Sequence, residues 1–136
     1  MKIIALKGAN SVGKSSTLNL VCDNLIKTGS TIHTSKIVRG NPSKNDFECI
    51  LNYMGKSIAI YTMGDFGYLT IAAIKNYESL SIDVLIIATN NRLVKPTKEI
   101  LKYTNVIISK TVASPKTPSN NLKANKDDCN LIISHI

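Results

Sequence analysis

The sequence predicts an α/β fold, a three-layer α/β/α sandwich whose mostly parallel sheet carries one antiparallel edge strand. Two observations support this fold class. Short apolar segments of strand length alternate with segments of helical periodicity, and residues 82–88 are apolar enough for a strand buried on both faces. Right-handed crossovers then join the parallel strands. The expected parallel strands are residues 2–7, 57–63, 82–88 and 106–109.

A strand and a helix are expected on either side of residues 8–15. Residues 2–7 have an apolar centre and predict a short strand, and residues 16–27 predict a helix that begins near Lys14. The apolar side chains of this helix recur at i, i+3, i+4, i+7 and i+8, on one face. They are Leu18, Val21, Cys22, Leu25 and Ile26. Gly29 stands where a left-handed C-terminal cap is expected.

The middle of the chain predicts a loop followed by a hairpin. Residues 30–46 are polar and contain Gly40 and Pro42, so we expect a loop, in which residues 36–38 could add a short extended piece. Residues 47–53 alternate between apolar and polar side chains, as in a half-buried strand, and residues 54–56 turn the chain into the next strand. The first strand of this hairpin is expected at the edge of the sheet.

The second half of the chain continues the alternation of helices and strands. A helix is expected from residues 64–67 to about Leu80, a second from Pro96 to about Tyr103, and a closing helix that opens near residues 127–128. Residues 111–121 contain two prolines among Ser, Thr and Asn, which indicates a loop.

The composition indicates one globular domain over residues 1–136. Hydrophobic residues make up 43% and charged residues 19%, which is ordinary for a soluble chain. No apolar run approaches the ~18 residues that a membrane span requires, and the N-terminus lacks a signal-peptide pattern. We therefore expect a cytoplasmic protein without a membrane partner. Three cysteines without a Cys-x-x-Cys pair favour reduced, structural thiols.

The formal net charge of +8 is concentrated in the C-terminal third, where Glu99 is the one acid between Arg92 and Lys126. A solvated, lysine-rich surface is the favoured interpretation, because the basic residues are mostly lysines without interleaved aromatic side chains. Nucleic acid is the less favoured partner for this surface.

The strongest functional signal is the segment Gly8-Ala9-Asn10-Ser11-Val12-Gly13-Lys14-Ser15, which matches Gly-x4-Gly-Lys-[Ser/Thr] between a strand and a helix. Gly8 and Gly13 allow successive N–H groups, those of Asn10, Ser11 and Val12 included, to turn around a phosphate. The helix N-terminus adds its own N–H groups and the positive end of its dipole. Lys14 is expected on the β- and γ-phosphates, and the Ser15 hydroxyl on Mg²⁺. A glycine-rich turn that matches by chance is the alternative.

Three further residues lie at the same expected edge of the sheet. Asp65 ends the apolar strand 57–63 and is the candidate acid beside the phosphates, as metal ligand and catalytic group together with Lys14. The less favoured alternative is that Asp65 only caps the following helix. Arg92 could contact a phosphate or a base, or be an ordinary surface arginine. Lys110 follows the last parallel strand, where a base often sits.

On these residues the chain resembles a P-loop NTPase, with a layout similar to compact nucleotide-kinase-like P-loop proteins. The resemblance implies the P-loop NTPase fold, with Mg²⁺ and ATP or another NTP as cofactors. It further implies that Gly13, Lys14 and Ser15 bind phosphate and magnesium, that Ser16 assists at the α-phosphate, and that Asp65 is the acid of the second motif. Asp65-Phe66-Gly67 is one residue short of the GTPase pattern Asp-x-x-Gly, and Thr89-Asn90-Asn91-Arg92 replaces Asn-Lys-x-Asp.

The leading hypothesis is therefore an ATP-preferring protein that slowly hydrolyses NTP or transfers a phosphoryl group to a small acceptor. Lys14 alone would be a slow catalyst, because phosphoryl transfer needs positive charge on the γ-phosphate. The sequence contains only two arginines, Arg39 and Arg92, so an arginine-rich lid is missing. A nucleotide-dependent switch or accessory subunit that acts on a protein partner is the alternative. The sequence leaves the oligomeric state open.

Overall fold

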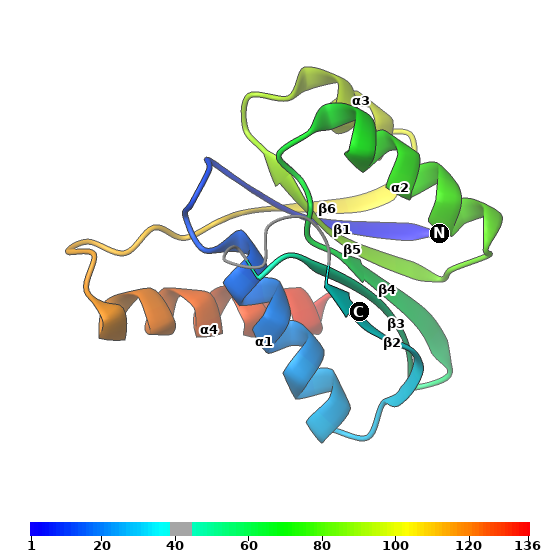
Figure 1. The fold of residues 1–136 in the computed structure, drawn as a ribbon, viewed down its shortest axis with the longest axis horizontal. Coiled ribbons are helices and arrows are strands. Elements are labelled where there is room, and N and C mark those ends of the chain that lie inside the picture. Colours follow the sequence, from blue (N-terminus) through cyan, green and yellow to red (C-terminus); the bar gives the residue numbers. More distant parts are fainter. Residues whose placement is uncertain (39–44) are drawn as a thin grey trace.

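The computed structural model describes residues 1–38 and 45–136. Strands and helices alternate along most of the chain (Figure 1). The elements are β1 (Lys2–Gly8), α1 (Lys14–Lys27), β2 (Thr31–Val38), β3 (Phe47–Tyr53), β4 (Lys56–Tyr61), α2 (Gly67–Ser79), β5 (Val84–Asn90), α3 (Val94–Ile100), β6 (Thr104–Ser109) and α4 (Pro118–Ser134). In the described part of the chain, no helix is both long and apolar enough to cross a lipid bilayer.

The six strands of the described residues form one sheet in the order β2-β3-β4-β5-β1-β6. The pairs β4–β5, β5–β1 and β1–β6 are parallel, whereas β3 is antiparallel to both of its neighbours. Helices α1 and α4 pack on one face and α2 and α3 on the other (Figure 1). The expected α/β class and the four parallel strands are confirmed, and the helices on both faces are compatible with a three-layer sandwich.

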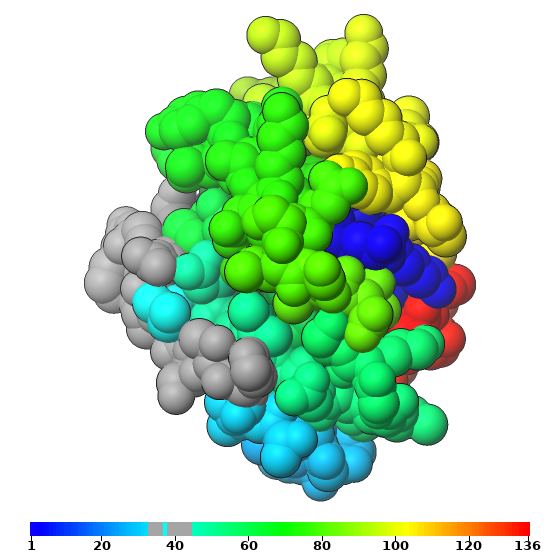
Figure 2. Space-filling model, turned by 90° about the vertical axis from the view of Figure 1, so that its right-hand side faces the viewer, coloured from blue at the N-terminus to red at the C-terminus, as the bar shows by residue number. Residues whose placement is uncertain are grey.

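Two apolar cores hold these layers together. The core under α1 and α4 includes Leu18, Val21 and Ile132, and the core under α2 and α3 includes Ile74 and Ile100, all with exposures of 0%. The three cysteines are buried thiols, as expected. Figure 2 shows the N-terminal and C-terminal residues side by side, where Lys2 Nζ donates to the carbonyl oxygen of His135 at 2.5 Å.

The edge of the sheet differs from the prediction. Residues 31–38 of the segment expected as a loop over residues 30–46 form β2, so β3 is an inner strand and β2 is the edge. Ile32 and Ile37 of β2 are 54% and 38% exposed, and the pairing with β3 is irregular. Because an edge strand with exposed apolar residues has no clear buried face, its alternation is weak in the sequence. Residues 39–44 of the expected loop, Arg39 included, lie outside the described residues.

The closing helix also begins earlier than expected, at Pro118 rather than near residues 127–128. Thr117 caps it, because its Oγ1 accepts a hydrogen bond from the N–H of Asn120 at 3.2 Å, and Pro118 occupies the first helical turn. Figure 1 shows the first turns of α4 extending beyond the strands. These turns bury little apolar surface, so their sequence lacks the periodicity that predicts a helix.

Strand register brings the carboxyl ends of three strands together. Gly8 at the end of β1 lies opposite Asn90 of β5, and Lys7 lies opposite Ser109 of β6. The connections that follow these strands therefore start at one edge of the sheet, which is where ligands bind in open parallel sheets.

Candidate functional site

Residues 8–15, here called the glycine-rich loop, connect β1 to α1. Gly13 has φ +93°, a left-handed conformation that other residues adopt at a cost. A Cβ on Gly13 would also lie 2.9 Å from Asn125 Oδ1 of α4. At Gly8 the need is one of space, because a Cβ there would lie 2.9 Å from Lys110 Cβ. The two glycines of the motif are thus required by a loop that fits closely against β6 and α4.

The loop ends at the N-terminus of α1, which no side chain of residues 1–38 or 45–136 caps. Gly13 occupies the N-cap position of α1, and among the described residues no side chain caps this helix and no acidic residue stands in its first turn. The N–H groups of the first turn have no intrahelical acceptor. Together with the helix dipole, they provide the electrostatic conditions for anion binding.

The side chain of Lys14 extends back across the glycine-rich loop to the residues at the start of the loop. Its Nζ donates to the carbonyl oxygens of Gly8 at 3.1 Å and Ala9 at 2.5 Å, and lies 3.9 Å from Asp65 Oδ1. The residue is only 7% exposed. Burial lowers the pKa of the Lys14 ammonium, and the neighbouring carboxylates of Asp65 and Asp46 partly oppose this shift. Burial removes water from the Lys14 ammonium, and an anion bound at the loop would stabilise its charged form in place of that water.

Asp65 reaches this ammonium from a strand that does not touch β1, because β5 lies between β4 and β1. The connection after β4 crosses the end of β5 so closely that a Cβ on Gly64 would lie 2.1 Å from the carbonyl oxygen of Ala88. Asp65 Oδ1 is buried and has no hydrogen-bond partner within the described residues. This orphaned acceptor is consistent with a donor that the protein itself does not supply.

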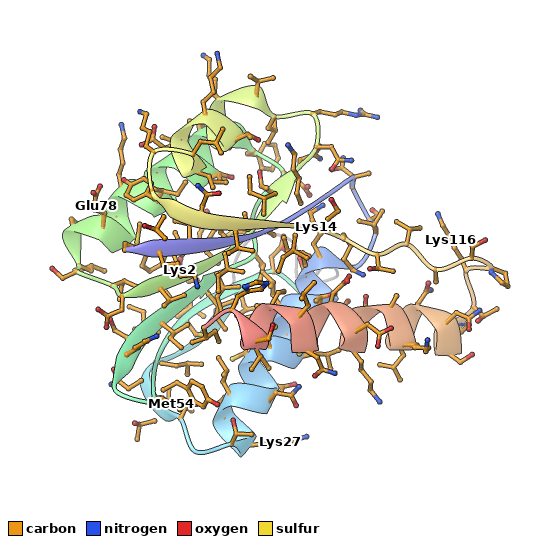
Figure 3. The ribbon with its side chains drawn as sticks, turned by 180° about the vertical axis from the view of Figure 1, so that it is seen from behind. Lys2, Lys14, Lys27, Met54, Glu78 and Lys116 are labelled. Carbon is orange, nitrogen blue, oxygen red and sulfur yellow. The ribbon has the colours of Figure 1, made fainter. Side chains whose placement is uncertain are left out.

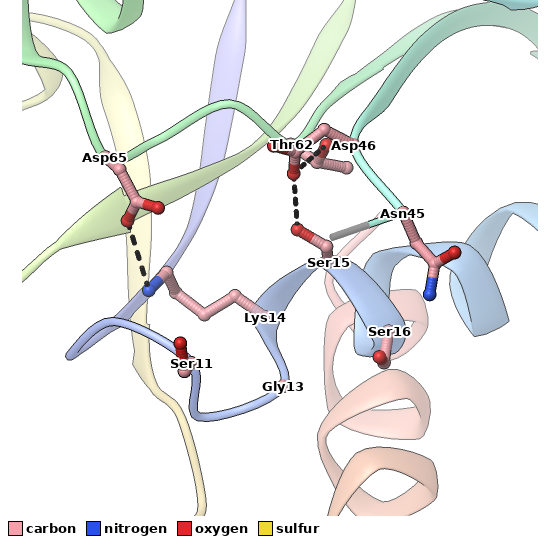
Figure 4. Close-up of a pocket in the computed structure, with 9 residues that line it drawn as sticks. All are labelled: Ser11, Gly13, Lys14, Ser15, Ser16, Asn45, Asp46, Thr62 and Asp65. Atoms are coloured by element: carbon pink, nitrogen blue, oxygen red, sulfur yellow. Dashed lines mark hydrogen bonds and ion pairs between the residues drawn. The ribbon is translucent and has the colours of Figure 1, made fainter. Parts of the chain in front are cut away.

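Asp46, which sequence reasoning missed, lies nearer to Ser15 than Asp65 does to Lys14. Ser15 Oγ donates to Asp46 Oδ1 at 2.8 Å, and the buried Thr62 hydroxyl donates to the same oxygen at 3.2 Å (Figure 4). The position of Asp46 in the sequence could have indicated that it lies at this edge of the sheet. Asp46 directly precedes β3, and because β3 is antiparallel to β4, the first residues of β3 lie at the same edge of the sheet as the last residues of β4.

Most of the candidate residues line one cavity of about 280 Å³, here called the loop cavity. Figure 4 shows Lys14 pointing toward Asp65, Ser15 toward Asp46, and Ser16 away from Lys14. The lining residues are Ser11, Gly13, Lys14, Ser15, Ser16, Asn45, Asp46, Thr62 and Asp65. The structure therefore brings together the expected Ser11, Gly13, Lys14, Ser15, Ser16 and Asp65, and adds three residues that were not expected.

A second cavity of about 230 Å³, the α4 cavity, lies on the other side of the loop. It shares Ser11, Gly13 and Ser16 with the loop cavity, and Val12 also lines it. Its far wall comes from the β6–α4 connection and from α4 itself. The remaining lining residues are Thr111, Val112, Ala113, Lys116, Asn121, Ala124 and Asn125. Figure 3 shows this connection, with Lys116 on it, as a long extended segment above α4.

The other expected contacts lie elsewhere. Asn10 accepts a hydrogen bond from the Asn90 side-chain amide and does not line either cavity. Arg92 lines a separate groove between α2 and α3. Lys110 is held inside the protein, with its Nζ 2.8 Å from Asp128 Oδ2, so its ammonium is not available to a base.

The donor set of the loop cavity fits a hard cation. Ser15, Thr62, Asp46 and Asp65 provide oxygen atoms, and the described residues contain no cluster of three or more His, Cys, Asp or Glu side chains. Mg²⁺ takes one or two protein oxygen ligands and completes its shell with phosphate oxygens and water. A structural zinc site, in contrast, needs four closely grouped nitrogen or sulfur ligands.

Comparison of the chain with protein-family models, with curated proteins and with solved structures finds no match.

Proposed function

We propose that this chain is a P-loop NTPase that binds a magnesium nucleoside triphosphate at the glycine-rich loop. The proposal rests on three features found together at the loop cavity. They are a helix N-terminus that no described side chain caps, the buried ammonium of Lys14, and the Ser15 hydroxyl beside the carboxylate of Asp46. These groups suit a polyphosphate with a divalent cation.

The charges of the loop cavity support the magnesium complex over the free nucleotide. Among the described residues that line it, Lys14 is the one cation, against the carboxylates of Asp46 and Asp65. A free polyphosphate would be attracted by Lys14 and repelled by both acids. Mg²⁺, held through Ser15 with Asp46 or Asp65, supplies charge neutralisation on the phosphates.

In this proposal each side of the loop has its own task. The N–H groups of Gly13, Lys14 and Ser15 hold the β- and γ-phosphates in the loop cavity, and Ser16 supports the α-phosphate where the two cavities meet. The base lies in the α4 cavity, where the side-chain amides of Asn121 and Asn125 offer both donors and acceptors. The preference for ATP rests on the missing guanine-reading pattern Asn-Lys-x-Asp.

The proposed reaction is slow NTP hydrolysis or phosphoryl transfer to a small acceptor. Positive charge on the developing γ-phosphate speeds this reaction, and here Lys14 provides it without help from Arg92, which faces another groove. Asp65 Oδ1, which lacks a hydrogen-bond donor among the described residues, can accept a proton from the attacking water or hydroxyl.

A nucleotide-dependent switch is the second candidate, because Asp65 lies only two residues before α2. A phosphate or cation that draws Lys14 or Asp65 toward itself would change the start of this helix. In the switch the output is binding of a protein partner rather than turnover.

Isothermal titration with Mg-ATP tests the shared premise of both candidates. We expect saturable binding by the wild-type protein, competition by ADP, and loss of binding in Lys14→Ala and after removal of Mg²⁺ with EDTA. Lys102→Ala is the matched control, because Lys102 is 67% exposed and its side chain contacts Glu99 rather than the loop. Absence of heat and of ADP competition for the wild type would refute the proposal.

A further inference from the structure

A groove between α2 and α3 remains unused by the proposed nucleotide site. Its volume is about 720 Å³, larger than either cavity at the glycine-rich loop. The two helices lie side by side on one face of the sheet (Figure 1), and their first turns touch, since a Cβ on Gly67 would lie 3.3 Å from Pro96 Cγ. One wall of the groove is therefore α2, and the other is the first turn of α3 with the two residues before it.

Large apolar side chains are exposed in the groove and directly beside it. Tyr68 on α2 is 71% exposed and Val94 on α3 is 64% exposed. Phe66, directly before α2, is 59% exposed, and its ring centroid lies 6.2 Å from that of Tyr68. Exposed aromatic and aliphatic side chains gathered at a hollow are typical of protein-binding surfaces.

The polar part of the groove is basic. Lys75 of α2 and Arg92 and Lys95 on the α3 side line it, and none of the described residues that line it is acidic. A complementary ligand must therefore carry carboxylates around an apolar centre. A groove between two helices accepts an amphipathic helix whose anchors recur at i, i+3, i+4 and i+7.

We infer that the α2–α3 groove docks an acidic amphipathic helix of a protein partner. The apolar anchors of that helix insert between Tyr68 and Val94, and its carboxylates pair with Lys75, Arg92 and Lys95. The groove is separate from the proposed nucleotide site, because none of the described residues that line it also lines the loop cavity or the α4 cavity.

Selection from displayed libraries of 14-residue helices tests this inference with the nucleotide-free full chain. Both libraries carry the same randomised apolar face; one has Glu and Asp on the remaining positions and the other has Lys and Arg. We expect the protein to enrich the acidic library and not the basic one. Binding of the best acidic peptide is then measured by fluorescence anisotropy.

The variants compare charge inside and outside the groove. Lys75→Glu/Lys95→Glu should lower the affinity for the acidic peptide by about tenfold or more, because two charges at the rim of the groove change sign. Lys27→Glu/Lys126→Glu makes the same change of net charge on the exposed surfaces of α1 and α4 and should leave the affinity unchanged. Val94→Ser should also weaken binding, because it removes an apolar contact.

Four results would overturn the inference. They are no enrichment of the acidic library, equal enrichment of the basic library, an equal loss of affinity in both double-charge variants, and binding of phosphatidylserine vesicles without binding of any peptide. The last result would assign the groove to an anionic membrane surface instead.

Discussion

The buried ion pair between Lys110 and Asp128 holds the Lys110 side chain against the glycine-rich loop. Removal of one charge of this pair should therefore destabilise the fold. The two side chains are 0% and 4% exposed, and Lys110 Nζ lies 2.8 Å from Asp128 Oδ2. Thr111 also donates to this carboxylate, from its N–H at 2.9 Å and from its Oγ1 at 2.6 Å. The carbon chain of Lys110 in turn fills the space beside Gly8 and Gly13.

Asp128→Asn leaves the Lys110 ammonium buried opposite a neutral amide. Removal of one partner of a buried pair costs about 3–5 kcal/mol in the free energy of unfolding, because the remaining charge is uncompensated. Lys110→Met/Asp128→Leu removes both charges and keeps the volume similar. The loss in this double variant is then mainly that of the two Thr111 hydrogen bonds, about 1 kcal/mol each. The double variant should therefore be more stable than Asp128→Asn.

Urea unfolding followed by circular dichroism measures both differences. Lys110→Met alone supplies a further check, because it leaves the Asp128 carboxylate with its two Thr111 donors and should be milder than Asp128→Asn. A free energy of unfolding of Asp128→Asn within about 1 kcal/mol of the wild-type value would refute this role of the ion pair, as would a double variant that is no more stable than Asp128→Asn.

Three further predictions concern single positions. Asp46→Asn should raise the Mg²⁺ concentration needed for ATP binding by about tenfold, because Asp46 orients the Ser15 hydroxyl; an unchanged magnesium titration would contradict this role. Gly64→Ala should cost about 1–3 kcal/mol, since its Cβ would lie 2.1 Å from a carbonyl oxygen of β5. A thermal melt that matches the wild type would show that the close approach is absent. The phenol of Tyr103 donates to Glu78 Oε2 at 2.7 Å, which raises the pKa of Tyr103 to about 12. Glu78→Gln should lower that pKa in an ultraviolet pH titration, and no change would exclude the hydrogen bond.

The parallel part of the fold was predictable because its strands are buried. β5 is buried along its whole length, and residues 82–88 accordingly read as an apolar run. β2 is the opposite case: an edge strand with exposed isoleucines gains its pairing from β3, and the paired residues are between 9 and 21 positions apart in the sequence. Local periodicity carries no information about such a partner.

The residues of the candidate site also divide into those that a local motif predicts and those that depend on tertiary contacts. Gly13, Lys14 and Ser15 were found because their spacing is local and their chemistry depends on one loop. Asp46 was missed because its role depends on a tertiary contact between the start of β3 and the start of α1. Arg92 and Lys110 were placed at the correct edge of the sheet, but the edge alone did not show which groove an arginine faces or which buried acid holds a lysine.

A crystal structure with Mg²⁺ and a non-hydrolysable ATP analogue would show whether the glycine-rich loop binds a magnesium nucleotide. We predict that the polyphosphate accepts hydrogen bonds from the N–H groups of Gly13, Lys14 and Ser15, and that the cation lies beside Ser15 with Asp46 or Asp65. An analogue bound elsewhere, or a loop whose N–H groups bond to the protein itself and exclude the phosphates, would contradict it.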